Sequence, residues 1–419
     1  MSAPLLVTGG LGFIGSAFVR RLAARGLDVV NVDAGTYAAD RRRLDGAGHV
    51  RTVELDVAWP GLAELVAELR PARVVHFAAE THVTRSESDP DAFFRANVEG
   101  TRRVLELATL TASRGAGLMR FAHVSTAYVA GTHRGPFREE DLALGQGFNN
   151  TYERSKWEAE QLVGAQARHL PVQVFRPSIV VGDDRTGWTS SFNVIYTPLR
   201  AYAHGALPAI PARRSAPVDV VPVSYVARAI LALADAGPGR TFHLAAGPAA
   251  STIGELIDRG AELLDQPRAR ALPPALYRRV VHPLLMRRGG PAQRRWLEGG
   301  QVFFPYLATR VRFEIEATRA ALGDAGLGPV PPLASYLHTL LDFAERAKWG
   351  RRPLPRSTVA PSGGGGVDER EVDGGADPGP DGPDRDGDRS QQRPGPGDGP
   401  RARARGSAGG AGVPEHAER

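Results

Sequence analysis

Three glycines set three residues apart near the start of the chain constrain its fold more than any other feature. Gly9, Gly12 and Gly15 stand in the string TGGLGFIG, after the apolar run LLVT and before a stretch with helical spacing. Glycine allows a tight backbone turn, a close approach of backbone to a pyrophosphate, and close packing of helix on strand. The free N–H groups at the start of that helix attract phosphate. The string therefore predicts a dinucleotide-binding turn, with Phe13 and Ile14 beside the ligand.

An acidic residue follows the second apolar run, at the position that contacts the ribose in such folds. Asp33 ends the run DVVNV, eighteen residues after Gly15. A carboxylate there hydrogen-bonds the adenosine ribose hydroxyls and repels a 2′-phosphate, which favours NAD over NADP. The arginines at 41–43 keep NADP open if their loop folds back, whereas a solvated basic loop is the alternative. Asp56, with Val57 beside it in the string ELDV, is expected to meet the adenine.

Apolar runs alternate with helical stretches as far as about residue 180, a pattern typical of a parallel sheet covered by helices on both faces. We expect strands that end near Thr8, Asp33, Phe77, Ser125 and Arg176. We expect helices over residues 15–25, 60–69, 91–110 and 152–167. The predicted fold class is α/β, with a Rossmann-type doubly wound parallel sheet.

The regular alternation ends after residue 184, and the composition changes again beyond residue 350. We predict an NAD(P)-binding Rossmann domain over 1–184, a smaller, mainly helical substrate-binding cap over 185–350 that interleaves with it, and a disordered C-terminal tail over 351–419. Helical pieces are expected over 224–234, 252–264 and 333–348. The tail is rich in Gly, Pro, Asp, Arg and Ser and has too few large apolar residues to offset its ordering entropy.

A tyrosine and a lysine stand four residues apart in TYERSKWEAEQL, so a helix places Tyr152 and Lys156 on one face. A tyrosine has a pKa of about 10, and a neighbouring ammonium lowers it. We therefore predict that Tyr152 exchanges a proton with the substrate oxygen, while Lys156 tunes it and holds the nicotinamide ribose. Ser125 and Thr126 follow a central strand and lie where ligands bind. We favour Thr126 as the second group on that oxygen, the alternative being a hydroxyl that only satisfies backbone.

Together these features resemble the extended short-chain dehydrogenase/reductase superfamily over about residues 4–350. The strings HFAA, ANVEGT and RPSIVVG are further matches. The resemblance implies that Ala78 and Ala79 flank the cofactor ribose and pyrophosphate. It also implies that Asn97 supports the active site from a helix and that Pro177 to Ile179 line the nicotinamide.

Within that superfamily the chain resembles two branches. DAGTYAADRRRL and HFAAETHVTRSESDP are similar to the nucleotide-sugar 4,6-dehydratases, which use bound NAD and carry an acidic pair directly after the catalytic threonine. Ala127 and Tyr128 stand there instead, so dehydration lacks its acid and base groups. HVSTAYVAGT, NTYERSKWEAEQLV and FRPSIVVGDDRTGWT resemble the thioester reductase and fatty acyl-CoA reductase branch, that of the male sterility NAD-binding proteins.

The resemblance implies an NAD(P)-dependent oxidoreductase that reduces an acyl thioester or a derived carbonyl by hydride transfer. Its substrate is a small molecule, with coenzyme A or an acyl carrier protein as the group that bears the acyl chain. The alternative is a nucleotide-sugar epimerase, or with less support a 4,6-dehydratase, with tightly bound NAD. A third hypothesis is a cofactor-binding scaffold without chemistry, against which the intact Thr126, Tyr152 and Lys156 argue.

Composition narrows the partners further. A net charge of +6 suits the phosphates of coenzyme A or an acidic carrier, and ordinary surface charge explains it equally well. The arginines are spread along the chain without a nucleic-acid-binding module, so no nucleic acid is expected. The sequence has no cysteine, no N-terminal export signal and no apolar run of about 18 residues, which predicts a cytoplasmic protein without a membrane-spanning helix. The scattered histidines predict no metal site.

Three other groups carry weaker signals. His82 and Arg85 follow the HFAA string and face either substrate or solvent. Arg213 and Arg214 form either a substrate phosphate clamp or an exposed pair. The stretch over 272–288 combines apolar residues with arginines, so it lies on a membrane surface, flanks an acyl channel, or packs as a cap helix on the core.

Overall fold

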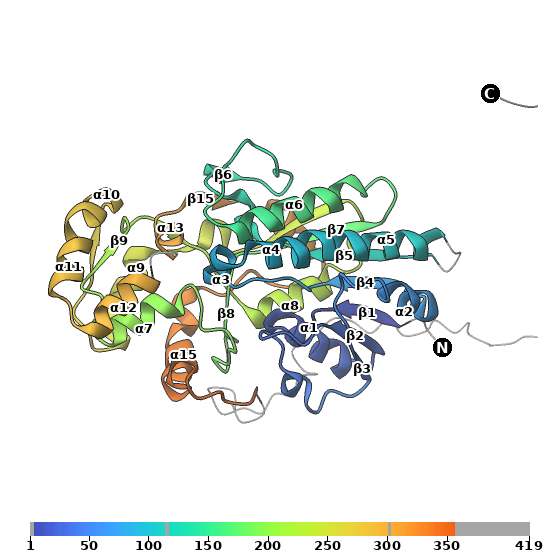
Figure 1. Ribbon diagram of the computed structural model, residues 1–419, viewed down its shortest axis with the longest axis horizontal. Helices are drawn as coiled ribbons and strands as arrows, with labels where there is room; N and C mark the ends of the chain where they lie inside the picture. The colour runs from blue at the N-terminus through green and yellow to red at the C-terminus, as the bar shows by residue number, and fades with distance from the viewer. Residues whose placement is uncertain (1–3, 114–116, 301–302, 357–419) are drawn as a thin grey trace, which may run out of the picture. The chain divides into compact units, whose positions relative to one another are not determined.

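A seven-stranded parallel sheet lies at the centre of the chain (Figure 1). The computed structural model describes residues 4–113, 117–300 and 303–356. The strand order is β12, β7, β5, β4, β1, β2, β3, and every neighbouring pair is parallel. This confirms the predicted doubly wound α/β fold. The strands are β1 Leu5–Thr8, β2 Val29–Asp33, β3 Val50–Glu54, β4 Arg73–His76, β5 Arg120–Val124, β7 Val172–Pro177 and β12 Arg240–Leu244.

The direction in which strands are added to the sheet reverses between β1 and β4. Thr8 pairs in register with Val32 on one side and with His76 on the other, so these three strands end at one level. Loops that follow β1, β2 and β4 therefore open at the same edge. In open α/β sheets this crevice is where ligands bind.

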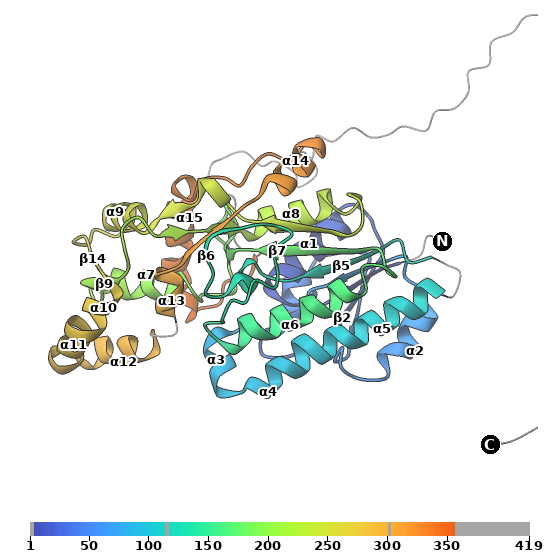
Figure 2. The same cartoon turned by 90° about the horizontal axis from the view of Figure 1, so that it is seen from above.

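Helices cover both faces of the sheet (Figure 2). One face packs against α1 Phe13–Ala24 and α8 Val223–Ala232, whose apolar residues share a buried cluster with β7 and β12. The other face packs against three helices, α2 Leu62–Leu69, α5 Gly100–Ser113 and α6 Thr151–Ala165. Burial on both sides explains why the strands are near-continuous apolar runs in the sequence.

The predicted helix over 91–110 is interrupted. It consists of α4 Pro90–Phe93, a π-helical turn η2 Phe94–Glu99 and then α5. A π-turn adds a residue to the helical repeat and shifts the side chains after it, which apolar spacing does not reveal. The turn contains Asn97, one of the predicted site residues.

The chain leaves the sheet after β7, passes through β8 Ile179–Val181, which pairs with β11, and returns to the sheet twice, as α8 on its face and as β12 at its edge. A second apolar core lies between α7 Tyr196–Ala203, α9 Ile253–Leu263 and α15 Leu333–Arg346. The division at residue 184 therefore stays a prediction, and most of the predicted tail, 357–419, lies outside the described residues.

Short elements complete the described part of the chain. The strands are β6 Arg134–Phe137, β9 Ala209–Pro211, β10 Pro217–Val218, β11 Val220–Pro222, β13 Ser251–Thr252, β14 Arg270–Leu272 and β15 Arg310–Phe313. The helices and helical turns are η1 Arg41–Leu44, α3 Val83–Ser88, η3 Ala127–Ala130, η4 Gly247–Ala249, α10 Pro274–Leu276, η5 Tyr277–Val281, α11 His282–Arg288, α12 Pro291–Gly299, α13 Phe304–Leu307, α14 Glu316–Asp324 and η7 Lys348–Gly350.

Candidate active site

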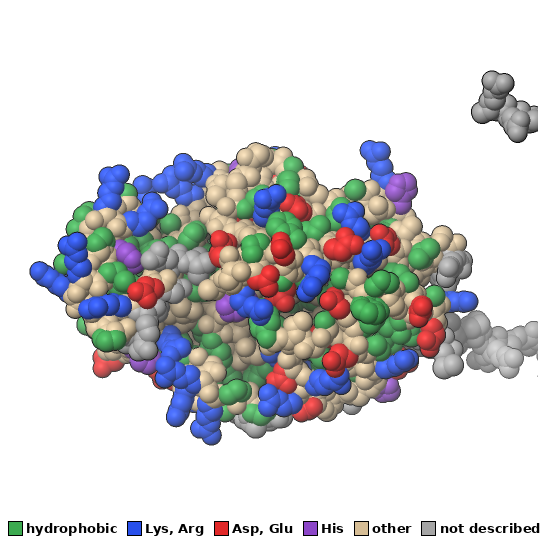
Figure 3. Space-filling model, viewed as in Figure 1, with side chains coloured by type: hydrophobic (Ala, Val, Ile, Leu, Met, Phe, Trp, Pro, Cys, Tyr) green, Lys and Arg blue, Asp and Glu red, His purple; other side chains and the backbone are tan. Residues whose placement is uncertain are grey.

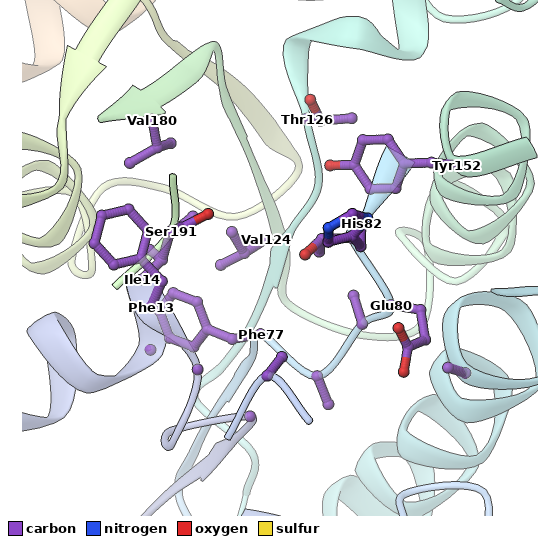
Figure 4. Close-up of a pocket in the computed structure, with 18 of the residues that line it drawn as sticks. Phe13, Ile14, Phe77, Glu80, His82, Val124, Thr126, Tyr152, Val180 and Ser191 are labelled. Atoms are coloured by element: carbon purple, nitrogen blue, oxygen red, sulfur yellow. The ribbon is translucent and has the colours of Figure 1, made fainter. Parts of the chain in front are cut away.

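A cavity of about 530 Å³ opens at the carboxyl ends of the central strands. It contains every predicted site residue except Asn97: Gly9, Gly12, Phe13, Ile14, Gly15, Asp33, Asp56, Val57, Ala78, Ala79, Ser125, Thr126, Tyr152, Lys156, Pro177 and Ile179. In Figure 4 Thr126 and Tyr152 lie on one side of this space, and Val180 and Ser191 lie on the other. The fold thus gathers residues from the ends of six strands around one space.

The glycine turn has the crowding that its spacing predicted. Gly9 has φ +77°, and a Cβ built on it would stand 2.6 Å from the backbone nitrogen of Ala78. A Cβ on Gly15 would stand 2.2 Å from the carbonyl oxygen of Gly9. Gly12 is different, because its Cβ would meet only that same carbonyl, at 3.1 Å. Gly9 and Gly15 are therefore required by packing, whereas Gly12 leaves room on the cavity side for a ligand.

The Asp33 carboxylate is held in place by the backbone. Its Oδ2 accepts from the Leu11 N–H at 2.9 Å and its Oδ1 accepts from the Gly35 N–H at 3.0 Å. The side chain is buried at the end of β2 and lines the cavity. A carboxylate fixed in this way has a defined direction in which to accept from ribose hydroxyls.

The three consecutive arginines at 41–43 differ in their contacts. Arg41 pairs with Glu54 and Arg42 with Asp40, both on the surface, as the solvated-loop interpretation expects. Arg43 instead folds back, and its Nη1 donates to the carbonyls of Leu11 and Ala38 at 2.6 and 2.7 Å. Burial lowers the pKa of Arg43, against the opposing charges of Asp40 and Asp33. One cation therefore lines the cavity on the Asp33 side.

Thr126, Tyr152 and Lys156 converge as the sequence predicted. Asn150 caps α6, since its Oδ1 accepts from the Glu153 N–H at 3.0 Å, and this fixes where the helix starts. The Thr126 hydroxyl donates to the Pro177 carbonyl at 3.4 Å and accepts from the Tyr128 N–H at 3.2 Å, so it satisfies backbone while it lines the cavity beside Tyr152. Lys156 donates from Nζ to the Val124 carbonyl at 2.8 Å. Two hydroxyls and one ammonium thus surround the end of β5.

Burial dominates the titration of this group. It raises the pKa of Tyr152 to about 12, although the nearby Thr126 hydroxyl lowers it, and it lowers the pKa of Lys156 to about 8. The expectation that Lys156 lowers the pKa of Tyr152 is not met in this arrangement, because desolvation dominates that pKa and the charge of Glu153 raises it further. At neutral pH Tyr152 therefore carries its proton, and can act as a donor.

Asn97 lies behind the cavity and does not line it. Its Nδ2 donates to the Glu80 carbonyl at 3.0 Å and to Ser155 Oγ at 2.9 Å, and its Oδ1 accepts from the Glu80 N–H at 2.8 Å. It joins η2 and α6 to the loop that follows β4. This is a supporting position, and the prediction that Asn97 contacts the cofactor is not met by this geometry.

A cluster at the cavity mouth joins His82 and Arg85, which carried weak signals in the sequence, to Tyr37 and Glu80, which carried none. Tyr37 donates its hydroxyl proton to Glu80 Oε2 at 2.8 Å, and the Arg85 guanidinium lies 3.9 Å from the centre of the Tyr37 ring. His82 meets the same ring edge-on, with 6.3 Å between ring centres. Burial and the neighbouring Glu80 raise the pKa of Tyr37. Tyr37 stands in a loop without periodicity, so only the position of that loop after β2 could have indicated it.

The substrate side of the cavity is largely uncharged. Ser190, Phe192, Asn193 and Tyr306 line it together with Tyr128. The carboxylates among the lining residues are Asp33, Asp56 and Glu80. The residue directly after Thr126 is Ala127, which is fully buried, so this position holds no carboxylate.

The other weak signals in the sequence belong to residues that do not line the cavity. Arg214 pairs with Asp258 on the surface, and neither it nor Arg213 lines the cavity, so the phosphate-clamp interpretation is not supported. Within residues 4–113, 117–300 and 303–356 no cluster of three acidic or histidine side chains is placed to hold a metal ion. Over the same residues no helix is both long and apolar enough to cross a bilayer.

Comparison with known proteins agrees with this geometry. Residues 59–230 match the family described as male sterility protein. Over 176 residues the chain is 40% identical to a dTDP-glucose 4,6-dehydratase of Xanthomonas campestris pv. campestris. The matched region is 39% of this chain and 48% of the relative. It is 38% identical over 183 residues to dTDP-glucose 4,6-dehydratase 1 of Escherichia coli, with 39% and 50% covered. The chain thus spans about half the length of the curated relatives it matches.

Solved structures share the fold over most of the chain. The terminal R domain from the myxalamid PKS-NRPS biosynthetic pathway superposes with a TM-score of 0.68 at 24% identity, covering 84% of this chain and 92% of that one. The dTDP-glucose 4,6-dehydratase DesIV of Streptomyces venezuelae, a double mutant solved with NAD bound, superposes with a TM-score of 0.62 at 25% identity, covering 83% and 99%. Both proteins therefore share the fold of this chain over more than four-fifths of its length.

Proposed function

Because the chain belongs to the extended short-chain dehydrogenase/reductase superfamily, we propose that it is an NAD(P)-dependent oxidoreductase that reduces an acyl thioester or a carbonyl derived from one. The observation that carries this proposal is that Thr126, Tyr152 and Lys156 line one cavity, which also contains the glycine turn. A binding turn and a proton donor at one crevice are what a hydride-transfer enzyme requires.

The cavity fits a nicotinamide dinucleotide. Gly12 leaves space where a side chain would obstruct a pyrophosphate, and the start of α1 faces that space. Asp33 would hold the adenosine ribose, and Lys156 the nicotinamide ribose. When bound, the reduced cofactor supplies the hydride. The fixed Asp33 carboxylate favours NAD, while Arg43 beside it keeps NADP open.

The chain's own residues supply the proton and the orientation. Tyr152 carries its proton at neutral pH and donates it to the substrate oxygen as negative charge develops there. Thr126 donates a hydrogen bond to the same oxygen and keeps it in line with the tyrosine. Lys156, charged below a pKa of about 8, would hold the nicotinamide ribose and so orient the cofactor beside the substrate oxygen.

The alternative is a nucleotide-sugar epimerase, or with less support a 4,6-dehydratase, that retains its NAD. The names of the curated relatives favour that substrate class. Among the described lining residues, no carboxylate directly follows Thr126. Dehydration needs a further acid and base, so this position disfavours a dehydratase.

One assay separates these functions. Oxidation of NADH and NADPH is followed against acyl-coenzyme A thioesters of increasing chain length, and in parallel nucleotide sugars are incubated with the enzyme and NAD. Cofactor oxidation with a thioester, and no conversion of nucleotide sugars, is the expected outcome. Conversion of a dTDP- or UDP-sugar without net cofactor consumption would replace the reductase with the epimerase or dehydratase.

A further inference from the structure

One helix at the end of the molecule away from the sheet carries exposed apolar residues between arginines. Residues 274–288, here called the tip helix, form a continuous run of α10, η5 and α11. Figures 1 and 2 both place α10 and α11 at the end opposite the strands β1, β2 and β3. The tip helix is thus remote from the cavity, and the proposed function does not use it.

The apolar residues of the tip helix form a stripe. Leu276, Val280 and Leu284 are spaced four residues apart, which aligns side chains along one face of a helix. Their exposed fractions are 47%, 54% and 44%. They are three of the few large apolar side chains of the described residues that are this exposed. The stretch therefore presents an exposed apolar face, in addition to whatever contacts it makes with the core.

The opposite side of the tip helix is fastened to the cap. Tyr277 is fully buried, and its ring meets the ring of Phe304 edge-on with 5.6 Å between centres. This contact holds the helix to the described cap. The exposed stripe therefore belongs to a helix that the buried Tyr277 anchors to the cap, and substitutions in the stripe leave the Tyr277 contact in place.

The charge around the stripe has one sign. Residues 266–297 contain eight arginines and no aspartate or glutamate. Arg278, Arg279, Arg287 and Arg288 are exposed on the tip helix, and none of them forms an ion pair with another described residue. Figure 3 shows Lys and Arg side chains gathered over this end of the molecule. Arg268, before the tip helix, pairs with Asp258, whereas the four arginines of the tip helix itself have no acidic partner among the described residues.

We propose that the tip helix docks on an anionic membrane surface. Apolar side chains in line along a helix enter the headgroup boundary, while the arginines beside them pair with lipid phosphates. An acidic protein would match the arginines, but it would also need a groove for three aligned apolar side chains on a protruding helix. The bilayer surface meets both requirements without a shaped partner, so it is the occupant that the pattern favours.

The test is flotation of the full chain with vesicles of phosphatidylcholine alone and of phosphatidylcholine with phosphatidylglycerol. The wild type is expected to float with the anionic vesicles only, and less at high salt. Replacing Arg278, Arg279, Arg287 and Arg288 by Gln should lower that binding at least about tenfold. The control replaces Arg51, Arg134, Arg168 and Arg319 by Gln, which removes the same charge from exposed sites elsewhere and should change binding less than about twofold.

A second variant separates a membrane from other anions. Val280→Ser with Leu284→Ser should lower vesicle binding several-fold and leave binding to poly-glutamate unchanged. Equal binding of the wild type to neutral and anionic vesicles would overturn the proposal, as would equal losses in the tip variant and its control. Self-association that the tip variant abolishes, without any vesicle binding, would replace the membrane with a second copy of the chain.

Discussion

Tyr37 donates a hydrogen bond of 2.8 Å to Glu80 across the mouth of the cavity. Tyr37 follows β2 and Glu80 follows β4, the two strands that flank β1 and its glycine turn. The bond therefore joins the two loops on either side of the pyrophosphate position. Asn97 fixes the loop of Glu80 from behind, so the link connects the exposed Tyr37 side chain to a held backbone.

Removing this link should speed cofactor release. Tyr37→Phe keeps the ring under Arg85 but loses the hydroxyl. Because the lost hydrogen bond is to a carboxylate at an exposed site, we expect the dissociation rate of the cofactor to rise about 3- to 10-fold. Stopped-flow displacement of NADH, followed by its fluorescence, measures that rate. Tyr202→Phe is the matched control, because the Tyr202 hydroxyl donates to the Pro267 carbonyl at 2.9 Å outside the cavity. Equal rates in all three proteins would show that the loops do not retain the cofactor.

The glycine turn predicts different outcomes at two positions. Gly12→Ala meets only one carbonyl, at 3.1 Å, so the fold should survive while cofactor affinity falls at least about tenfold. Gly9→Ala places a Cβ 2.6 Å from the Ala78 nitrogen at φ +77°, and should lower the free energy of unfolding by about 2 kcal/mol or more. Gly164→Ala, in the open on α6, is the control and should stabilise slightly. Thermal unfolding and cofactor titration together check these values; unchanged affinity in Gly12→Ala would contradict the assigned pyrophosphate position.

A buried histidine predicts acid sensitivity. Neither ring nitrogen of His123 has a hydrogen-bond partner within the described structure, and burial with the Lys156 charge holds its pKa well below 6.5. Below pH 6.5 the unfolded chain binds a proton that the folded protein does not. The free energy of unfolding therefore falls as pH drops, by about 1.4 kcal/mol per pH unit for this residue. His76 acts in the same direction, since burial lowers its pKa to about 3.

His123→Leu should flatten this loss, leaving the contribution of His76. Urea unfolding at pH values on both sides of 6.5 measures the effect, with the exposed His169→Leu as control. The slope of unfolding free energy against pH should decrease only in the buried variant. Parallel slopes for the wild type and His123→Leu would mean that another group causes the acid sensitivity.

Much of the fold and most of the candidate site follow from local patterns. Three local patterns each imply a spatial arrangement, because the geometry of strands and helices is regular. They are the glycine spacing, Asp33 at a strand end, and the four-residue separation of Tyr152 from Lys156. The rest depends on tertiary contacts. Nothing in the sequence shows that Asn97 lies on a π-turn behind the cavity, or that Arg43 folds back while its neighbours stay in solvent. The pKa of Tyr152 likewise depends on burial by segments distant in sequence.

The central claim, that Tyr152 donates the proton in a hydride transfer, has a direct test. Single-turnover oxidation of bound NADH by an acyl thioester is compared in the wild type, Tyr152→Phe and Tyr225→Phe. Burial also raises the pKa of Tyr225 to about 12, but that side chain lies outside the cavity. We expect Tyr152→Phe to slow the step by about 10²- to 10⁴-fold with NADH affinity within about twofold, and Tyr225→Phe to leave the rate unchanged. Near-normal turnover in Tyr152→Phe would contradict the account.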